Sequence, residues 1–236
     1  KLRPWKDWQA DPVPDETELE EMMNTFHNGP QPGRLLPMLK SAARARSLEE
    51  PPVYSFFAVA FRENEDSRKA ILEVFPSLEP LDKWAFLIAL RYGGQDVSGL
   101  VSTLPTEIQD SLASVQPLKS PEQLQSLFRD PVTAETAMSI GVRMDECWGG
   151  WIATGTPKYL RALVGLLEAA DDFPVFQKWM AAKQGAKGLN AQVARGMAYQ
   201  IAGWSLSSFQ RTDPQVADWL LFWENDPNMP STIRAQ

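Results

Sequence analysis

The chain has one cysteine, Cys147, and one histidine, His27, among its 236 residues. A single cysteine excludes a disulfide within these residues. A single imidazole and a single thiol do not make a zinc ligand set, and together the two counts remove most metal and triad chemistries. The sequence therefore predicts no metal site and no catalytic residues of these common kinds.

Phosphate-binding loops are also missing. The chain contains no G-x-G-x-x-G pattern, no Walker-type loop and no CxxC motif. Gly203-Trp-Ser205 resembles part of a nucleophile elbow, but the closing glycine is missing and no strand is predicted before it. We expect neither a nucleotide nor any other cofactor.

Positive charge is scarce, and long apolar runs are missing. The formal net charge is −7, which opposes contact with nucleic acid because such proteins must neutralise phosphates. The one basic cluster, Arg34 with Lys40, Arg44 and Arg46, is interpreted as the solvated face of a helix. The longest apolar run, 84–90, is too short to cross a bilayer. We expect a soluble protein with no membrane span and no nucleic-acid partner.

The sequence does contain a rich set of helix signals. Apolar residues make up 44%, and no segment shows sustained apolar–polar alternation, so no strand is predicted. Small polar residues before proline predict helix starts at Ser120, Asp130, Thr156 and Asp213, and Asp15 predicts another. The predicted helices are 15–28, 34–47, 52–63, 66–75, 81–92, 96–103, 106–114, 121–128, 132–139, 144–154, 157–169, 173–183, 189–209 and 214–224.

Three of these helices share an aromatic residue seven positions before a turn. The pairs are Phe57 with Asn64, Phe86 with Gly93 and Trp148 with Gly155, and Trp204 with Arg211 is a fourth candidate. Two helical turns separate the members of a pair, so each ring is expected on the buried face. This spacing favours an all-α fold of stacked helical hairpins, an irregular α-solenoid, with a closed helical bundle as the alternative.

The domain organisation follows from the same signals. Residues 1–14 carry Trp5, Trp8 and three prolines and predict an irregular N-terminal arm. Residues 15–236 are predicted to form one helical-repeat-like domain, and 183–188 is the best candidate for a linker.

The densest motif runs from Asp145 to Leu160. Trp148 and Trp151 lie one helical turn apart, and two glycines stand between them. One interpretation is that a neighbouring helix packs closely against the glycines and that both tryptophans are in the core. The other is an aromatic groove for a peptide or small ligand, formed by Asp145, Trp148, Trp151, Tyr199 and Trp204. Asp145 itself is interpreted as a helix cap, with a catalytic carboxylate as the alternative.

Residues 145–160 and 202–216 resemble an uncharacterised group of small bacterial proteins, many with secretion signals. The residues that carry the resemblance are Asp145, Trp148 or Trp151, Ala153-Thr154-Gly155, Tyr159-Leu160, Trp204-Ser205-Leu206 with Ser208, and Pro214 with Val216. Cys147 departs from the group, where a tryptophan is expected. The resemblance implies a bacterial origin and a periplasmic or envelope location, with a cytoplasmic one as the alternative. It implies no activity.

Taken together, these features predict a non-enzymatic protein that binds another protein. Stacked hairpins present an extended surface, and the side chains of common catalysis are scarce. An envelope-associated adaptor and an immunity-type inhibitor are both compatible with an acidic chain. The rival hypothesis is a small-molecule binding protein or enzyme with a tryptophan-lined pocket around residues 145–204.

Overall fold

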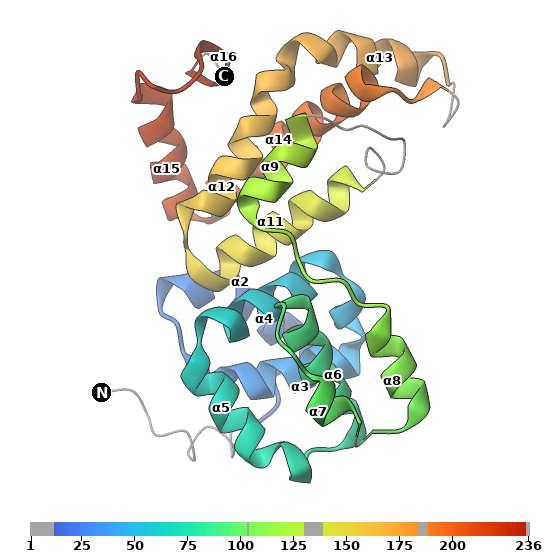
Figure 1. The fold of residues 1–236 in the computed structure, drawn as a ribbon. Helices are drawn as coiled ribbons and strands as arrows, with labels where there is room; N and C mark the ends of the chain where they lie inside the picture. Colours follow the sequence, from blue (N-terminus) through green and yellow to red (C-terminus); the bar gives the residue numbers. More distant parts are fainter. Residues whose placement is uncertain (1–11, 103, 130–138, 184–187, 235–236) are drawn as a thin grey trace. The chain divides into compact units, whose positions relative to one another are not determined.

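The computed structural model describes residues 12–102, 104–129, 139–183 and 188–234, and these are all helix, turn or loop (Figure 1). The all-α prediction is thus confirmed for the described residues. None of the described helices is both long and apolar enough to cross a membrane. The Asp130 cap, nearly all of the predicted helix 132–139, most of the 183–188 linker and residues 1–11 of the arm lie outside the described residues.

The chain forms two compact units. Unit 1 comprises the described residues up to Leu118 together with Trp148–Gly155, and unit 2 comprises Lys119–Cys147 and the described residues from Thr156 onward. Each unit has buried apolar residues of its own. The single domain expected over 15–236 stays a prediction, which calorimetry tests by counting unfolding transitions.

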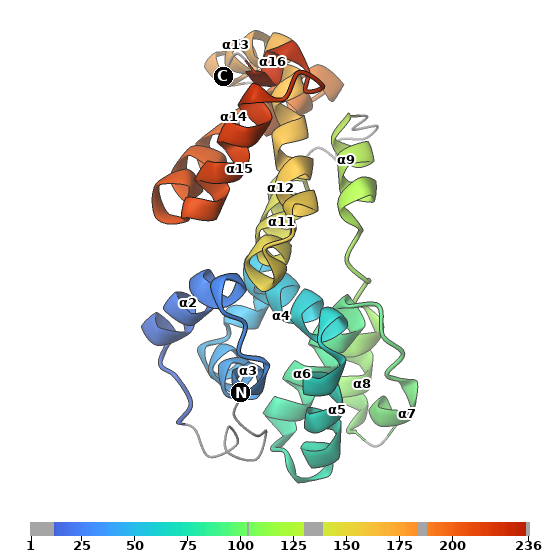
Figure 2. The same cartoon turned by 90° about the vertical axis from the view of Figure 1, so that its left-hand side faces the viewer.

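Among the described residues, unit 1 contains seven α-helices and the second half of α11 (Ile140–Thr154). The seven are α2 (Glu16–Thr25), α3 (Leu35–Ala45), α4 (Pro51–Glu63), α5 (Glu65–Val74), α6 (Pro80–Tyr92), α7 (Ser98–Val101) and α8 (Thr106–Ala113). Short 3₁₀ segments join some of them: η1 (Phe26–Asn28), η2 (Pro32–Arg34), η3 (Ser47–Glu49) and η4 (Phe75–Ser77). Helix α6 packs against α3, α4 and α8 (Figure 2).

The core of unit 1 is centred on α4. This helix is buried almost all round, from Val53 to Phe61, as expected for a helix with apolar residues on every face. Its rings pack edge to face with those of neighbouring segments: Phe56 lies 5.2 Å from Phe26, and Phe61 lies 5.3 Å from Phe86, centroid to centroid.

Asp82 is a buried carboxylate in unit 1 that corrects one expectation. It is 1% exposed on α6 and lies 3.7 Å from Lys40 Nζ and 3.8 Å from an Arg44 guanidinium nitrogen. Two of the four basic residues on and beside α3 therefore compensate a buried acid, because a buried charge needs an opposite one nearby. The interpretation of this cluster as a solvated helix face holds for the exposed Arg44 and Arg46, but it did not include the pairing of Lys40 and Arg44 with a buried acid.

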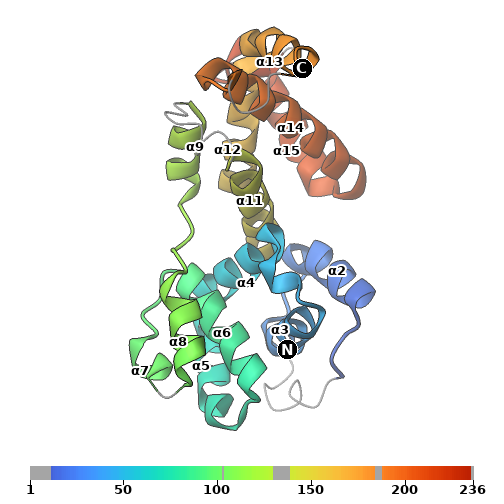
Figure 3. The same ribbon diagram turned by 90° about the vertical axis from the view of Figure 1, so that its right-hand side faces the viewer.

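Unit 2 contains α9 (Pro121–Arg129), the first half of α11, α12 (Pro157–Val164), η5 (Gly165–Asp172), α13 (Phe173–Ala181), α14 (Ala191–Thr212), α15 (Pro214–Asn225) and α16 (Ser231–Arg234). Helix α14 packs against η5, α13 and α15 (Figure 3). At Gly196, α14 approaches η5 and α13 very closely. A Cβ added to this glycine would lie 2.5 Å from the Asp172 carbonyl oxygen and 2.8 Å from Phe176 Cβ.

Three of the predicted helix starts, at Asp15, Ser120 and Asp213, are confirmed by their capping hydrogen bonds. Ser120 and Gln123 form the reciprocal capping box, with the Ser120 amide donating to Gln123 Oε1 over 2.8 Å and the Gln123 amide to Ser120 Oγ over 3.2 Å. Asp15 accepts from the Glu18 amide, and Asp213 from the Gln215 amide. Helix α12 begins at Pro157, as predicted.

The turns of the three aromatic pairs lie where they were predicted. Phe57 and Phe86 are fully buried, and Trp148 is 3% exposed. Helix α11 ends at Thr154, immediately before Gly155, whose φ of 62° is a left-handed conformation that favours glycine. The fourth pair is different. The turn between α14 and α15 follows at Asp213, but Trp204 is 71% exposed, so its ring is not on a buried face.

Candidate functional site

Two of the five residues predicted for a groove lie in the core of unit 1. Trp151 is 0% and Trp148 3% exposed, and the Trp151 ring lies 5.2 Å from that of the buried His27. Between them, Gly149 meets α4 so closely that a Cβ there would overlap Ser55 Oγ and lie 2.5 Å from the Pro52 carbonyl oxygen. The close-packing interpretation of this motif is confirmed at Gly149, and neither tryptophan presents its ring to solvent.

Asp145 lies inside α11, five residues after its first residue, Ile140. Its interpretation as a helix cap was therefore wrong. The buried side chains of Ile140 and Met144 extend the apolar stripe of the helix further toward its N-terminus than the sequence indicated. Burial raises the pKa of the Asp145 carboxyl above its ordinary 3.8, and the adjacent Glu146 carboxylate adds to the rise.

Replacing Asp145 with asparagine is expected to raise the melting temperature at pH 7. A raised pKa in the folded state means that ionisation of Asp145 costs stability, and this cost grows as the pH rises through that pKa. The gap between variant and wild type should close as the pH falls below about 3.8. Thermal denaturation across this range measures it. A melting temperature for Asp145→Asn that stays at or below wild type at pH 7 would contradict the assignment.

Cys147 carries no nucleophilic chemistry. Its side chain is fully buried, and burial raises the pKa of the thiol, with Glu146 contributing further. The reactive thiolate is thus strongly disfavoured. Cys147 is thus a small buried apolar residue of α11. Among the described residues, no three His, Cys, Asp or Glu side chains group as metal ligands.

The other two predicted residues lie on α14 in unit 2. Tyr199 is half-buried, and its ring lies 5.3 Å from the Phe173 ring of α13. Trp204 follows Gly203, which lines a groove between α14 and α15. With Trp148 and Trp151 in the core of unit 1, Trp204 is the member of the predicted set that offers a large ring to a partner.

The α14–α15 groove encloses about 310 Å³ and is lined by both apolar and polar residues. Its apolar lining residues are Val164, Leu167, Leu206, Ala217, Leu220, Leu221 and Trp223, and its polar ones are Ser207, Gln210 and Glu224. A shallower hollow on the adjoining face of α15 shares Leu221 and adds Phe222. Leu221 is 59% and Phe222 58% exposed. The groove and the hollow therefore form one continuous surface with large apolar side chains in solvent, here called the α14–α15 surface.

Charge on the α14–α15 surface has one sign. The groove contains Glu224, and the hollow contains Asp218 and Asp226, while neither is lined by lysine or arginine. Within the part of the chain that the structure describes, Asp218 and Glu224 form no ion pair. The surface thus combines apolar anchoring positions with uncompensated carboxylates.

The sequence carried one signal for this surface. Residues 219–223 read Trp-Leu-Leu-Phe-Trp, five consecutive large apolar side chains in a helix. One face of a helix cannot hold all five, so some must meet solvent unless the helix is covered on every side. The seven-residue aromatic rule drew attention to Trp204 but missed Leu221 and Phe222.

The chain was compared with known proteins in three ways. No family model, no curated protein and no solved structure matches it. The resemblance to the uncharacterised bacterial group stays a prediction, and the interpretation of the site rests on its own geometry.

Proposed function

We propose that this protein binds another protein through the α14–α15 surface. The observation that carries the proposal is the exposure of Leu221 and Phe222 on α15, which line this surface, with the exposed Trp204 on the neighbouring helix α14 next to Gly203 of the groove. Large apolar side chains cost free energy in water, about 25 cal/mol per Å² of apolar area. Contiguous apolar surface of this kind is typical of protein-interaction sites.

The chemistry of the surface indicates what it binds. Apolar side chains beside Asp218, Glu224 and Asp226 are complementary to an amphipathic helical segment that has apolar side chains on one face and lysine or arginine along its edge. The net charge of −7 adds a long-range attraction for such a partner. The partner is therefore a protein that presents a basic amphipathic segment.

A synthetic peptide provides the test. A helical peptide with leucine on one face and lysine on the other should bind the full chain, and a scrambled peptide of the same composition should bind far more weakly. Leu221→Ser should weaken binding by about 30-fold, as expected for a central anchoring residue. The matched variant is Leu81→Ser, an exposed leucine of unit 1. Equal binding of both peptides, or equal effects of both leucine variants, would contradict the proposal.

We also propose the role and the helix arrangement that the sequence predicted. The protein acts as an envelope adaptor or as an immunity-type inhibitor, without catalysis and without a cofactor. Its helices follow an irregular α-solenoid order, which the packing of α13, α14 and α15 on their neighbours in sequence supports. Cell fractionation tests the location. An inhibitor should abolish the activity of its bound partner at a one-to-one ratio, whereas an adaptor should leave that activity intact.

A further inference from the structure

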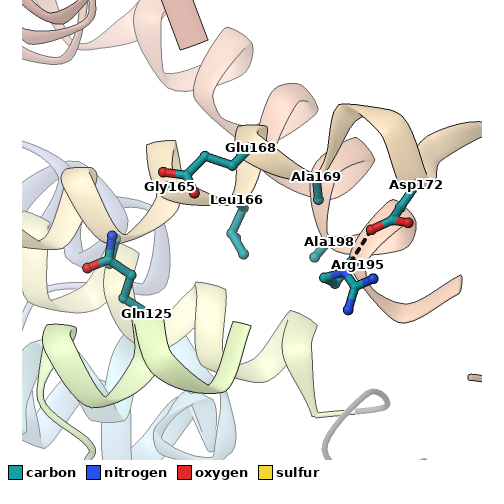
Figure 4. A pocket seen from close by; sticks show the side chains of 9 residues that line it. Gln125, Gly165, Leu166, Glu168, Ala169, Asp172, Arg195 and Ala198 are labelled. Carbon is teal, nitrogen blue, oxygen red and sulfur yellow. Dashed lines mark hydrogen bonds and ion pairs between the residues drawn. The ribbon is translucent and has the colours of Figure 1, made fainter. Parts of the chain in front are cut away.

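Unit 2 contains acids whose charge is balanced within the fold and acids whose charge is not. Asp172 is of the first kind, because it accepts a hydrogen bond from Arg195 Nε over 2.7 Å in the lining of a small hollow (Figure 4). Asp218 and Glu224 are of the second kind, since neither forms an ion pair with a residue that the structure describes. The α14–α15 surface therefore needs a basic counterpart from outside this fold.

Two copies of the α14–α15 surface do not suit each other. A face-to-face contact about a two-fold axis would join the same patch on both copies and would bury Leu221 and Phe222. It would also bring Asp218 and Glu224 toward the same acids of the other copy, and like charges across an interface cost free energy. A second copy that covers this surface must do so with a different part of its chain.

Residues 1–8, here called the basic segment, have the charge that the surface lacks. Their sequence is Lys-Leu-Arg-Pro-Trp-Lys-Asp-Trp, and they lie outside the described residues. Lys1, Arg3 and Lys6 fall within six positions that contain no acid, and no other six-residue window of the chain holds three basic residues. Positive charge is thus most concentrated here, in a chain whose net charge is −7.

Apolar residues of the basic segment recur at every third position. They are Leu2, Trp5 and Trp8, and Arg3 and Lys6 follow the same period. A polyproline II helix has three residues per turn, so this spacing gives an apolar edge beside a basic one, and Pro4 suits that conformation. The six steps from Leu2 to Trp8 would span about 19 Å. The 12 residues of α15 rise about 18 Å, so the two lengths match.

We propose that the basic segment of one copy of this protein binds the α14–α15 surface of a second copy. Its two tryptophan rings cover Leu221 and Phe222, and its basic side chains pair with the acids of the surface. This contact rests on the proposed function, because it uses the same surface. Eight residues bury less area than the roughly 800 Å² per partner of a standard interface, so a folded partner displaces them.

Sedimentation velocity of the full chain over a range of concentrations tests the contact. The wild type should associate reversibly. The double variant Trp5→Ser/Trp8→Ser removes the apolar edge of the segment, and Leu221→Ser removes an anchoring residue of the surface. Each should raise the dissociation constant of self-association by about 30-fold. The matched control is Leu81→Ser, an exposed leucine of unit 1, which should leave self-association unchanged.

An equimolar mixture of the two variants gives the sharpest result. The Leu221→Ser copy keeps its basic segment and the Trp5→Ser/Trp8→Ser copy keeps its surface, so one intact contact can form between them. The mixture should therefore associate more tightly than either variant alone. A wild type that stays monomeric at every concentration, or a mixture that associates no better than its components, would overturn the proposal.

Binding of the helical leucine–lysine peptide separates this contact from the proposed function. The Trp5→Ser/Trp8→Ser variant should bind that peptide at least as tightly as wild type, because a competing segment is lost, and weaker binding would count against the proposal. If the peptide binds but the mixture does not associate, the role of the basic segment alone is overturned. If the peptide does not bind either, the proposed function fails as well.

Discussion

Replacing Gly149 with alanine is expected to destabilise unit 1 by about 3 kcal/mol, the upper part of the range for overpacking a core. The added Cβ would overlap Ser55 Oγ and lie 2.5 Å from the Pro52 carbonyl oxygen and 2.8 Å from the Phe56 amide nitrogen. The last two are backbone atoms of α4, which cannot rotate out of the way. Helix propensity alone favours alanine by about 1 kcal/mol, so packing must outweigh it. Urea denaturation measures the difference in unfolding free energy.

The matched control lies in the same helix. Gly141 has nothing within 4 Å of the position that its Cβ would occupy, so Gly141→Ala should leave stability unchanged or raise it by up to about 1 kcal/mol. Ser55→Ala in the Gly149→Ala background should recover part of the loss, because the nearest atom is removed while the backbone atoms remain. Equal effects of alanine at 149 and 141 would show that α11 does not pack on α4 through this glycine.

Trp148→Ala is expected to lower the unfolding free energy by about 3–5 kcal/mol, because truncating a fully packed tryptophan leaves a cavity. Trp148 is 3% exposed, in the core of unit 1. For a chain of this length each kcal/mol corresponds to about 2–4 °C, so the melting temperature should fall by roughly 10 °C. Peptide binding at the α14–α15 surface, measured well below the melting point, should not change.

Trp204→Ala should behave in the opposite way. With 71% of this residue exposed, its loss should change stability by less than about 0.5 kcal/mol, while peptide affinity falls. For the Trp148→Ala and Trp204→Ala variants, circular-dichroism melting measures stability and fluorescence titration measures peptide affinity. If the Trp148→Ala protein is as stable as wild type but no longer binds the peptide, Trp148 belongs to the binding site and not to the core. A destabilised Trp204→Ala protein would mean that its ring is covered.

Local signals predicted the helix ends well. A capping side chain, a proline in the first turn or a glycine with positive φ acts within a few residues, so Ser120, Asp213 and Gly155 identified their boundaries without tertiary information. The interpretation of Asp145 as a cap failed because helix propensity is a weak guide. Gly141 disfavours a helix start, but the buried side chains of Ile140 and Met144 extend the helix over it.

Burial was harder to predict than helicity. The same aromatic spacing gives a buried ring at Trp148 and an exposed one at Trp204, because exposure depends on which segment covers the helix. Lys40 and Arg44 were interpreted as solvated, since nothing in the sequence indicates that Asp82 on a different helix lies beside them. A pocket in unit 2 is likewise lined by both Gln125 and Arg195, which are seventy residues apart in the sequence.

The central claim is that the α14–α15 surface is where this protein contacts its partner. Site-specific photo-crosslinking in the native host tests it most directly, with the photoreactive residue at position 221 in one sample and at position 81 in the other, two exposed leucines in different units. The account predicts one discrete protein adduct at 221, abolished by Phe222→Asp, with a basic amphipathic segment at the crosslinked site. No adduct at 221, or the same adduct at both positions, would contradict it.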